Sequence, residues 1–251
     1  MGVDLSAAAA LKDELNYEGV KYLKLGPGKH TIRILPPPGE MKLPWKKYKV
    51  AKVGPNEVRV TPPSQYDLQA EDPTVEERNR LLQMGDEASK QRADTLRHRD
   101  EFAIFAIKRG EEGQGPKLWT TSRKTINQLL AYFADPDVGD FTDPSSGRDI
   151  TIEGTAASGG KRGTDYTFTL KVKSSPLGKS DEMSNWLAVD LFAKFKVGRA
   201  SDANFIRAAM EGREKEYKEQ RKADYAAKRA QDTSFNPEEF SQPQTTAVDT
   251  A

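Results

Sequence analysis

Lysine, arginine and aromatic side chains stand close together in several stretches of this sequence. The densest stretch runs from Trp45 to Lys52, where the residue pattern is typical of a strand. Cationic side chains attract phosphates and release their counterions, and flat rings give unpaired bases a face to stack on, at about 1–3 kcal/mol per base. The pattern predicts a surface for single-stranded nucleic acid. Its expected residues are Arg33, Lys46, Lys47, Tyr48, Lys49, Lys52, Arg59, Phe105, Lys108, Arg109, Lys117, Trp119, Arg123, Lys124, Phe168 and Lys171.

An aromatic residue in a strand can equally belong to the hydrophobic core. Phe168 lies on an alternating apolar face and Phe105 lies within an unbroken apolar run, so periodicity alone favours the core for both. Tyr48 and Trp119 stand among basic residues and fit a groove as well as a core. Both interpretations stay open for these rings at the level of the sequence.

Charge is distributed unevenly along the chain. The 251 residues include 39 basic and 38 acidic side chains, which gives a net charge of +1. Residues 20–63, however, contain ten basic and only two acidic residues. Such a block usually marks a solvated strand face. Here it coincides with aromatic residues and strand patterns, which favours a surface for a polyanion.

Residues that could perform catalysis or bind a metal are scarce. The chain has no cysteine, and its only histidines are His30 and His98, which excludes thiolate zinc sites and cysteine nucleophiles. Asp135, Asp137 and Asp140 could serve a metal-dependent nuclease, but their Pro- and Gly-containing stretch is typical of a turn. We therefore expect no enzymatic activity, no metal and no cofactor.

Alternating and apolar runs, separated by Pro and Gly, fall at residues 20–25, 31–35, 45–53, 57–61, 102–107, 117–121, 149–155 and 165–173. These eight runs predict about seven short strands. A helix is expected from Pro73 to about Arg99, with a break at Gly85 and a capping box of Thr74 and Glu77. Further helices are expected at residues 123–134, capped by Ser122, and from Asp202 to about residue 229.

These elements fit a mainly β protein with helical additions (α+β). The expected fold is an OB-fold, a five-stranded Greek-key barrel, with a helical insertion and a long C-terminal helix. We expect a helical arm at 1–19, a core at 20–175 with the insertion at about 64–100, a helical region at 176–229 and a disordered tail at 230–251. The tail contains acids but no base; its acids are Asp232, Glu238, Glu239 and Asp249.

No segment approaches the ~20 apolar residues of a membrane span. Residues 1–19 show no basic segment followed by an apolar one, so we expect no signal peptide. The expected location is the cytoplasm, and no membrane partner is expected.

The order of four stretches resembles the single-stranded DNA-binding, or helix-destabilising, proteins of T-even-like tailed phages. The stretches are Gly28 to Pro36, Phe102 to Lys108 followed by Lys117-Leu118-Trp119, Ile126 to Ile150, and Tyr166 to Lys173. Together they cover roughly residues 20–175. The resemblance implies an OB-fold core that binds single-stranded DNA without sequence preference, with Phe168 near the bases.

The resemblance also implies an acidic C-terminal tail that contacts replication, recombination and repair proteins and competes with DNA for the basic groove. Two features depart from the family. T-even members have a cysteine-liganded zinc subdomain, whereas the matching insertion here has no cysteine, so zinc is not carried over. Their N-terminal arm is basic, whereas residues 1–19 are net acidic, which leaves self-association on DNA open.

The resulting hypothesis is a non-catalytic protein that coats and protects single-stranded DNA during phage-type replication, recombination and repair. The alternative is a protein-interaction or scaffold module that docks acidic partners through its basic face. Charge reversal at Lys47, Lys49 and Arg33 discriminates the two, because oligonucleotide binding should not survive it if these residues bind nucleic acid.

Overall fold

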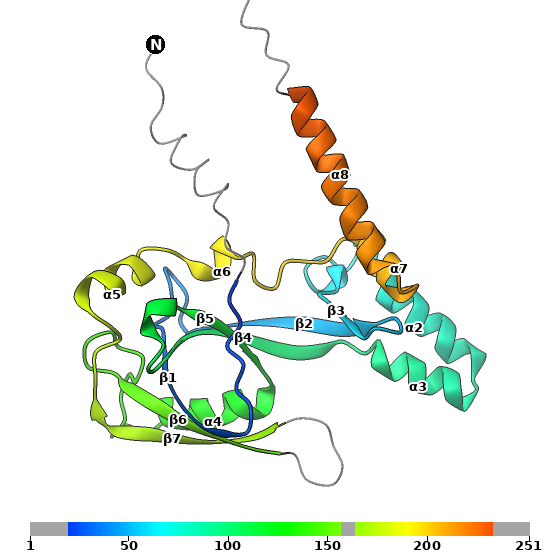
Figure 1. Cartoon of the computed structure of the whole chain (residues 1–251). Helices are drawn as coiled ribbons and strands as arrows, with labels where there is room; N and C mark the ends of the chain where they lie inside the picture. Colours follow the sequence, from blue (N-terminus) through cyan, green and yellow to red (C-terminus); the bar gives the residue numbers. More distant parts are fainter. Residues whose placement is uncertain (1–19, 157–163, 233–251) are drawn as a thin grey trace, which may run out of the picture.

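The structure, a computed structural model, describes residues 20–156 and 164–232 (Figure 1). Its seven strands are all paired antiparallel: β1 (Gly28–Ile34), β2 (Trp45–Val53), β3 (Val58–Val60), β4 (Arg99–Lys108), β5 (Lys117–Thr121), β6 (Arg148–Ala156) and β7 (Thr164–Ser174). The sheet order is β3-β2-β4-β1-β6-β7, and β5 pairs with β4. The expected arm at residues 1–19 and residues 233–251 of the expected tail lie outside the described residues, whereas residues 230–232, expected in the disordered tail, belong to the last helix.

Strand β4 is the centre of the sheet because it pairs with three other strands. Its first half pairs with β2, its second half pairs with β1, and β5 lies along its other edge. Residues 102–107 of β4 are all buried, as expected for a strand covered on both faces. Residues of β2 and β3 and the first residues of β7 line one cleft, so the elements at the two ends of the sheet approach each other.

The segment from Val20 to Leu25 lies between these two ends, where a further strand was expected. It forms a single parallel bridge, Tyr22 to Leu118, supported by Leu23 N donating to the Leu118 carbonyl at 2.9 Å. On its other side, the Tyr166 hydroxyl of β7 donates to the Leu25 carbonyl at 2.6 Å. Figure 1 shows this segment running from β5 towards β6 and β7. The result is an α+β fold with an open antiparallel sheet, and the five-stranded barrel expected from the sequence stays a prediction.

Two helices stand between β3 and β4, α2 (Pro73–Met84) and α3 (Glu87–Thr95). They separate at Gly85, whose φ of +75° is favourable for glycine. The N-cap of α2 is Asp72, which accepts from Thr74 N at 3.0 Å, so the expected Thr74 capping box is wrong. Helix α4 (Arg123–Phe133) follows β5, with Ser122 at its N-cap position but without a side-chain cap.

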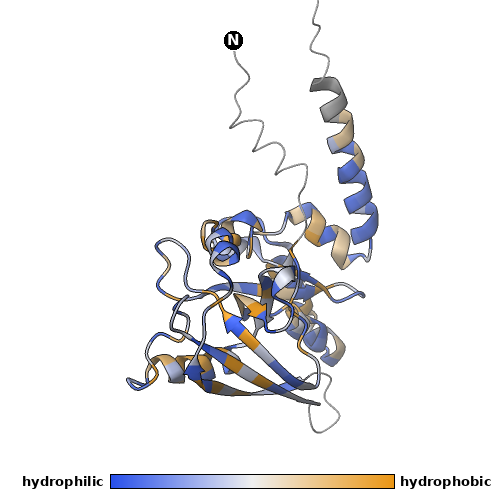
Figure 2. Ribbon diagram, turned by 60° about the vertical axis from the view of Figure 1, so that its left-hand side comes forward, coloured by the Kyte–Doolittle hydropathy of each residue, from blue (hydrophilic) through white to orange (hydrophobic). Residues whose placement is uncertain are grey.

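The C-terminal part of the described chain contains α5 (Ser180–Leu187), α6 (Leu191–Lys194), α7 (Ala203–Met210) and α8 (Glu214–Asp232). Asp202 caps α7 as expected, accepting from Phe205 N at 3.1 Å. The single helix expected from Asp202 onwards is nevertheless wrong. Gly212 adopts φ +76° between α7 and α8, and α8 projects away from the sheet as a largely hydrophilic rod (Figures 1 and 2).

Three clusters of buried side chains hold these elements together. The first lies between the sheet and α4 and includes Trp45, Trp119 and Phe168. The second joins Phe105 of β4 to Phe192 of α6. The third places α2, α3 and α7 on the β2–β3 hairpin. Among the described residues, no helix combines the length and the apolar character needed to cross a membrane.

Candidate nucleic-acid interface

A cleft with a volume of about 630 Å³ runs between the β2–β3 hairpin and the elements that follow β5. One wall comes from β2, β3 and residues 97–101, and the other comes from Thr120 to Gln128 and the start of β7. A second hollow of about 400 Å³ shares Val50, Arg59 and Glu101 with it. The two hollows form one continuous groove, called the basic cleft below.

The alternation of β2 explains which of its side chains reach the basic cleft. Tyr48, Val50 and Lys52 lie on one face of the strand, and all three line the cleft. In the antiparallel register, Lys52 stands opposite Arg59 of β3, and Tyr48 stands opposite Glu101 of β4. Directly opposite residues in a sheet point to the same side, so the neighbouring strands add two more charges to this face.

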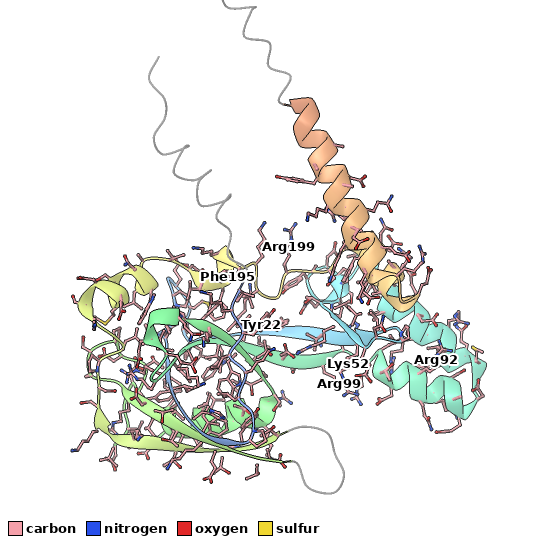
Figure 3. All side chains as sticks on the ribbon, in the orientation of Figure 1. Tyr22, Lys52, Arg92, Arg99, Phe195 and Arg199 are labelled. Atoms are coloured by element: carbon pink, nitrogen blue, oxygen red, sulfur yellow. The ribbon has the colours of Figure 1, made fainter. Side chains whose placement is uncertain are left out.

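Aromatic rings lie at the second hollow of the basic cleft. Tyr22 lines it with its side chain, and the residue as a whole is 57% exposed. Tyr48 and Phe195 line the same hollow, together with Arg199 from the linker after α6. Figure 3 shows Tyr22, Phe195 and Arg199 near one another, with Lys52 and Arg99 further along β2 and β4. Rings and cations therefore occur in one groove.

The linker after α6 is fixed against this part of the sheet by three polar contacts. Ser201 N donates to the Thr61 carbonyl at 2.8 Å, and Thr61 N donates back to Ser201 Oγ at 3.0 Å. The Tyr66 hydroxyl also donates to the Gly198 carbonyl. These contacts hold Arg199 beside the basic cleft, although it lies far from β2 in the sequence.

Most cations of the cleft have a carboxylate partner. Lys52 Nζ lies 2.6 Å from Glu57, Lys124 Nζ lies 3.4 Å from Asp165, Arg99 lies 3.5 Å from Asp94, and Arg59 is paired with Glu101. Across both hollows, seven lysine and arginine side chains face four carboxylates, an excess of three positive charges. Within the described part of the chain, neither Arg97 nor Arg199 has a carboxylate within 4 Å.

Tyr48 forms a hydrogen bond with Glu101, the carboxylate that is also paired with Arg59. Its hydroxyl donates to Glu101 Oε1 at 2.6 Å. Burial raises the pKa of Tyr48 to about 12, so this hydroxyl remains a donor throughout the neutral range. Glu101 thus fixes the side chains of both Tyr48 and Arg59.

Five of the residues expected to bind nucleic acid are buried instead, which corrects that expectation. Phe105, Trp119 and Phe168 are 2%, 3% and 7% exposed and pack in the core. Their rings have no free face for a base, so the core interpretation holds for Phe105, Phe168 and Trp119.

Arg33 and Lys117 are buried as well. Arg33 donates to the Asp143 carbonyl at 2.7 Å, and Lys117 is paired with Glu111.

Lys108 and Arg109 serve a structural network at the far end of β4. Lys108 shares Glu111 with Lys117, and these hydrogen bonds lower the pKa of Glu111 to about 2. Arg109 is paired with Asp149 at 2.7 Å and donates to the carbonyl oxygens of Pro176 and Leu177. Neither residue lines the basic cleft.

The remaining expected residues are divided between the cleft and other surfaces. Tyr48, Lys52, Arg59 and Lys124 line the cleft, and exposed Arg123 precedes Lys124 at the start of α4. Lys47 and Lys49 are exposed on the opposite face of β2, where Lys47 is paired with Asp100 at 3.0 Å. Lys46 borders a shallow hollow that also includes Arg199, and Lys171 is exposed on β7.

The structure adds Tyr22, Arg97, Arg99, Phe195 and Arg199 to the candidate site. The sequence did contain one signal, since Arg97 and Arg99 flank His98 just before β4. It gave none for Tyr22 and Arg199, which are brought to the cleft by the long-range contacts described above.

The described residues contain no group of three or more His, Cys, Asp or Glu side chains that could hold a metal ion. Asp135 and Asp140 act in turns, as their sequence context indicates. Asp135 Oδ1 accepts from Asp137 N at 3.0 Å, and Asp140 Oδ1 accepts from Thr142 N at 2.8 Å.

No protein-family model matches the chain, and no curated protein matches it either.

Proposed function

We propose that this chain is a non-catalytic, non-sequence-specific single-stranded DNA-binding protein. It coats and protects exposed strands in phage-type replication, recombination and repair. The single observation that supports this proposal best is the basic cleft, in which an excess of cations and the rings of Tyr22, Tyr48 and Phe195 share one continuous groove.

The chemistry of the cleft suits an unpaired strand. Its cations can contact successive phosphates, while an exposed ring such as Tyr22 can stack on a base of any sequence. In this proposal the sheet, with residues 20–25 beside β5, is the counterpart of an OB-fold barrel. The acids of the tail at 230–251 then contact replication and recombination proteins.

The alternative of a scaffold that binds acidic proteins uses only the cations of the cleft. It gives no role to the exposed ring of Tyr22 beside them, so the nucleic-acid proposal accounts for more of the site. Competition between a polyglutamate peptide and an oligonucleotide of equal charge decides between the two functions. Tighter binding of the peptide favours the scaffold.

The proposal is tested by fluorescence anisotropy of labelled oligo-dT over a salt series. We expect binding that weakens as salt rises. The combined variant Lys52→Gln, Arg97→Gln and Arg99→Gln should bind about tenfold or more weakly, with a salt slope lower by about 2, because each phosphate contact contributes about 0.7.

The matched control is Lys29→Gln, Lys90→Gln and Lys179→Gln, which removes three exposed cations outside the cleft. It should bind nearly as the parent does. Absence of binding by the parent, or binding independent of salt, would overturn the proposal. Equal losses in both triple variants would show that total charge, rather than the cleft, governs binding.

A further inference from the structure

Helix α8 is held to the rest of the described chain only near its start. It has 19 residues, a length of about 28 Å at 1.5 Å per residue. Glu214 accepts from Asn56 at 2.9 Å, and the Tyr217 hydroxyl donates to Asp202 at 2.8 Å. Arg221, which lies 3.8 Å from Asp202, is the last residue of α8 with a described contact to the body.

From Lys222 to Ala227 the helix is surrounded by solvent. Every residue from Lys222 to Ala227 is exposed, including Tyr225, which is 72% exposed. Figures 1 and 2 both show this part of α8 standing clear of the sheet and of the other helices. Isolated helices gain little stability in water at such lengths, so a binding partner would stabilise it.

The spacing of its charges gives α8 a basic row. Lys215, Lys218 and Lys222 follow each other at intervals of three and four residues, which places them along one face. Tyr225 continues the same spacing. The acids Glu216 and Asp224 fall on the opposite side of the helix, whereas Glu214 and Glu219 flank the row at intervals of three and four residues from its lysines.

These three lysines have no carboxylate within 4 Å among the described residues. Lys218 Nζ instead lies 5.4 Å from the centre of the Phe205 ring. Like charges at positions i and i+4, such as Lys218 and Lys222, disfavour the helix. Bound polyanion would remove this repulsion, so the row is complementary to phosphates.

A third hollow extends from the basic cleft to the end of α7, which precedes α8. It has a volume of about 460 Å³ and shares Lys52, Glu57 and Thr95 with the cleft. Arg92 also lines it, and it extends to Met210, the last residue of α7. A polynucleotide leaving the cleft past Lys52 can therefore follow a hollow surface to the end of α7, along which Lys52 and Arg92 are balanced by Glu57 and Glu77.

We propose that the basic row of α8 is a second contact for the same polynucleotide. Lys215, Lys218 and Lys222 bind the phosphodiester backbone of the strand after it leaves the basic cleft. This inference rests on the proposed function, and it predicts that α8 contributes only when the strand is longer than the cleft.

The test uses the full chain and two oligo-dT probes, one of about 8 and one of about 30 nucleotides, since one OB-fold covers about 4–16. In the variant Lys215→Gln, Lys218→Gln and Lys222→Gln, the dissociation constant of the short probe should stay within about twofold. That of the long probe should rise about tenfold, with its salt slope lower by about 2. The control triple at Lys29, Lys90 and Lys179 should change neither.

An unchanged long-probe affinity, or equal losses for both probes, would overturn the inference. A changed sedimentation coefficient of the DNA-free variant would also overturn it, because α8 would then contact a second copy. If the parent binds neither probe, the proposed function itself fails, which is a separate outcome from loss in the α8 variant alone.

Discussion

The guanidinium of Arg59 on β3 and the carboxylate of Glu101 on β4 form an ion pair across β2, at the floor of the basic cleft. The pair belongs to both main hollows. Glu101 is only 13% exposed at its side chain, whereas Arg59 is 49% exposed. The cation is therefore the partner that an incoming phosphate can reach.

This pair makes Glu101→Gln an informative substitution. The carboxylate competes with phosphate for Arg59 and repels the backbone, so its neutralisation should strengthen oligo-dT binding several-fold and raise the salt slope by about 0.7. Anisotropy measures both. Glutamine can still accept from the Tyr48 hydroxyl; weaker binding would instead show that Glu101 acts mainly by positioning Arg59.

Tyr22 is the ring in the cleft that is most open to a base. Tyr22→Ala should weaken oligo-dT binding by about five- to 150-fold, which corresponds to about 1–3 kcal/mol for one stacked base. Tyr22→Phe retains the ring and should bind like the parent. An abasic oligonucleotide lacks stacking partners, so the alanine variant should lose no affinity for it; an equal loss on both probes would contradict stacking.

Arg33 should affect stability rather than binding. Its side chain is fully buried between Asp143 and Asp149, and burial lowers the pKa of its guanidinium. Arg33→Met leaves the Asp143 carbonyl without its donor and should reduce the free energy of unfolding by about 3–5 kcal/mol. Urea denaturation measures this. A stable variant that loses oligo-dT affinity would restore Arg33 to the nucleic-acid interface.

Asp72 should contribute stability that depends on pH. Burial alone would raise the pKa of Asp72, but hydrogen bonds from Ser64 and Thr74 outweigh it, so the pKa is lowered in the folded state. Its contribution is therefore present above the unfolded pKa of about 4 and is lost as pH falls through the lower folded value.

The variant Asp72→Ala loses the N-cap of α2, which should cost about 1–2 kcal/mol at pH 7. The difference from the parent should shrink steadily below about pH 4, where the parent carboxylate becomes protonated. Urea denaturation across this range provides the measurement. A constant difference at every pH would show that the charge of Asp72 has no part in it.

The sequence alone predicts much of the local structure because local structure depends on neighbouring residues. Alternation in β2 and β7, the apolar run of β4 and the break at Gly85 all depend on patterns a few residues long. The prediction of one continuous helix from Asp202 was wrong at Gly212. A glycine within a charged helical pattern does not by itself show that the chain ends one helix and begins another there.

The site was less predictable because burial depends on which distant segment covers a face. Helix α4 and β5 enclose Phe168, and α6 covers Phe105, so basic neighbours in the sequence did not reveal these core positions. Tyr22 and Arg199 are far apart in the chain but meet at one hollow through the bridge to Leu118 and the linker contact at Thr61. Residue types set the available chemistry, and only tertiary packing decided which side chains stayed in solvent to perform it.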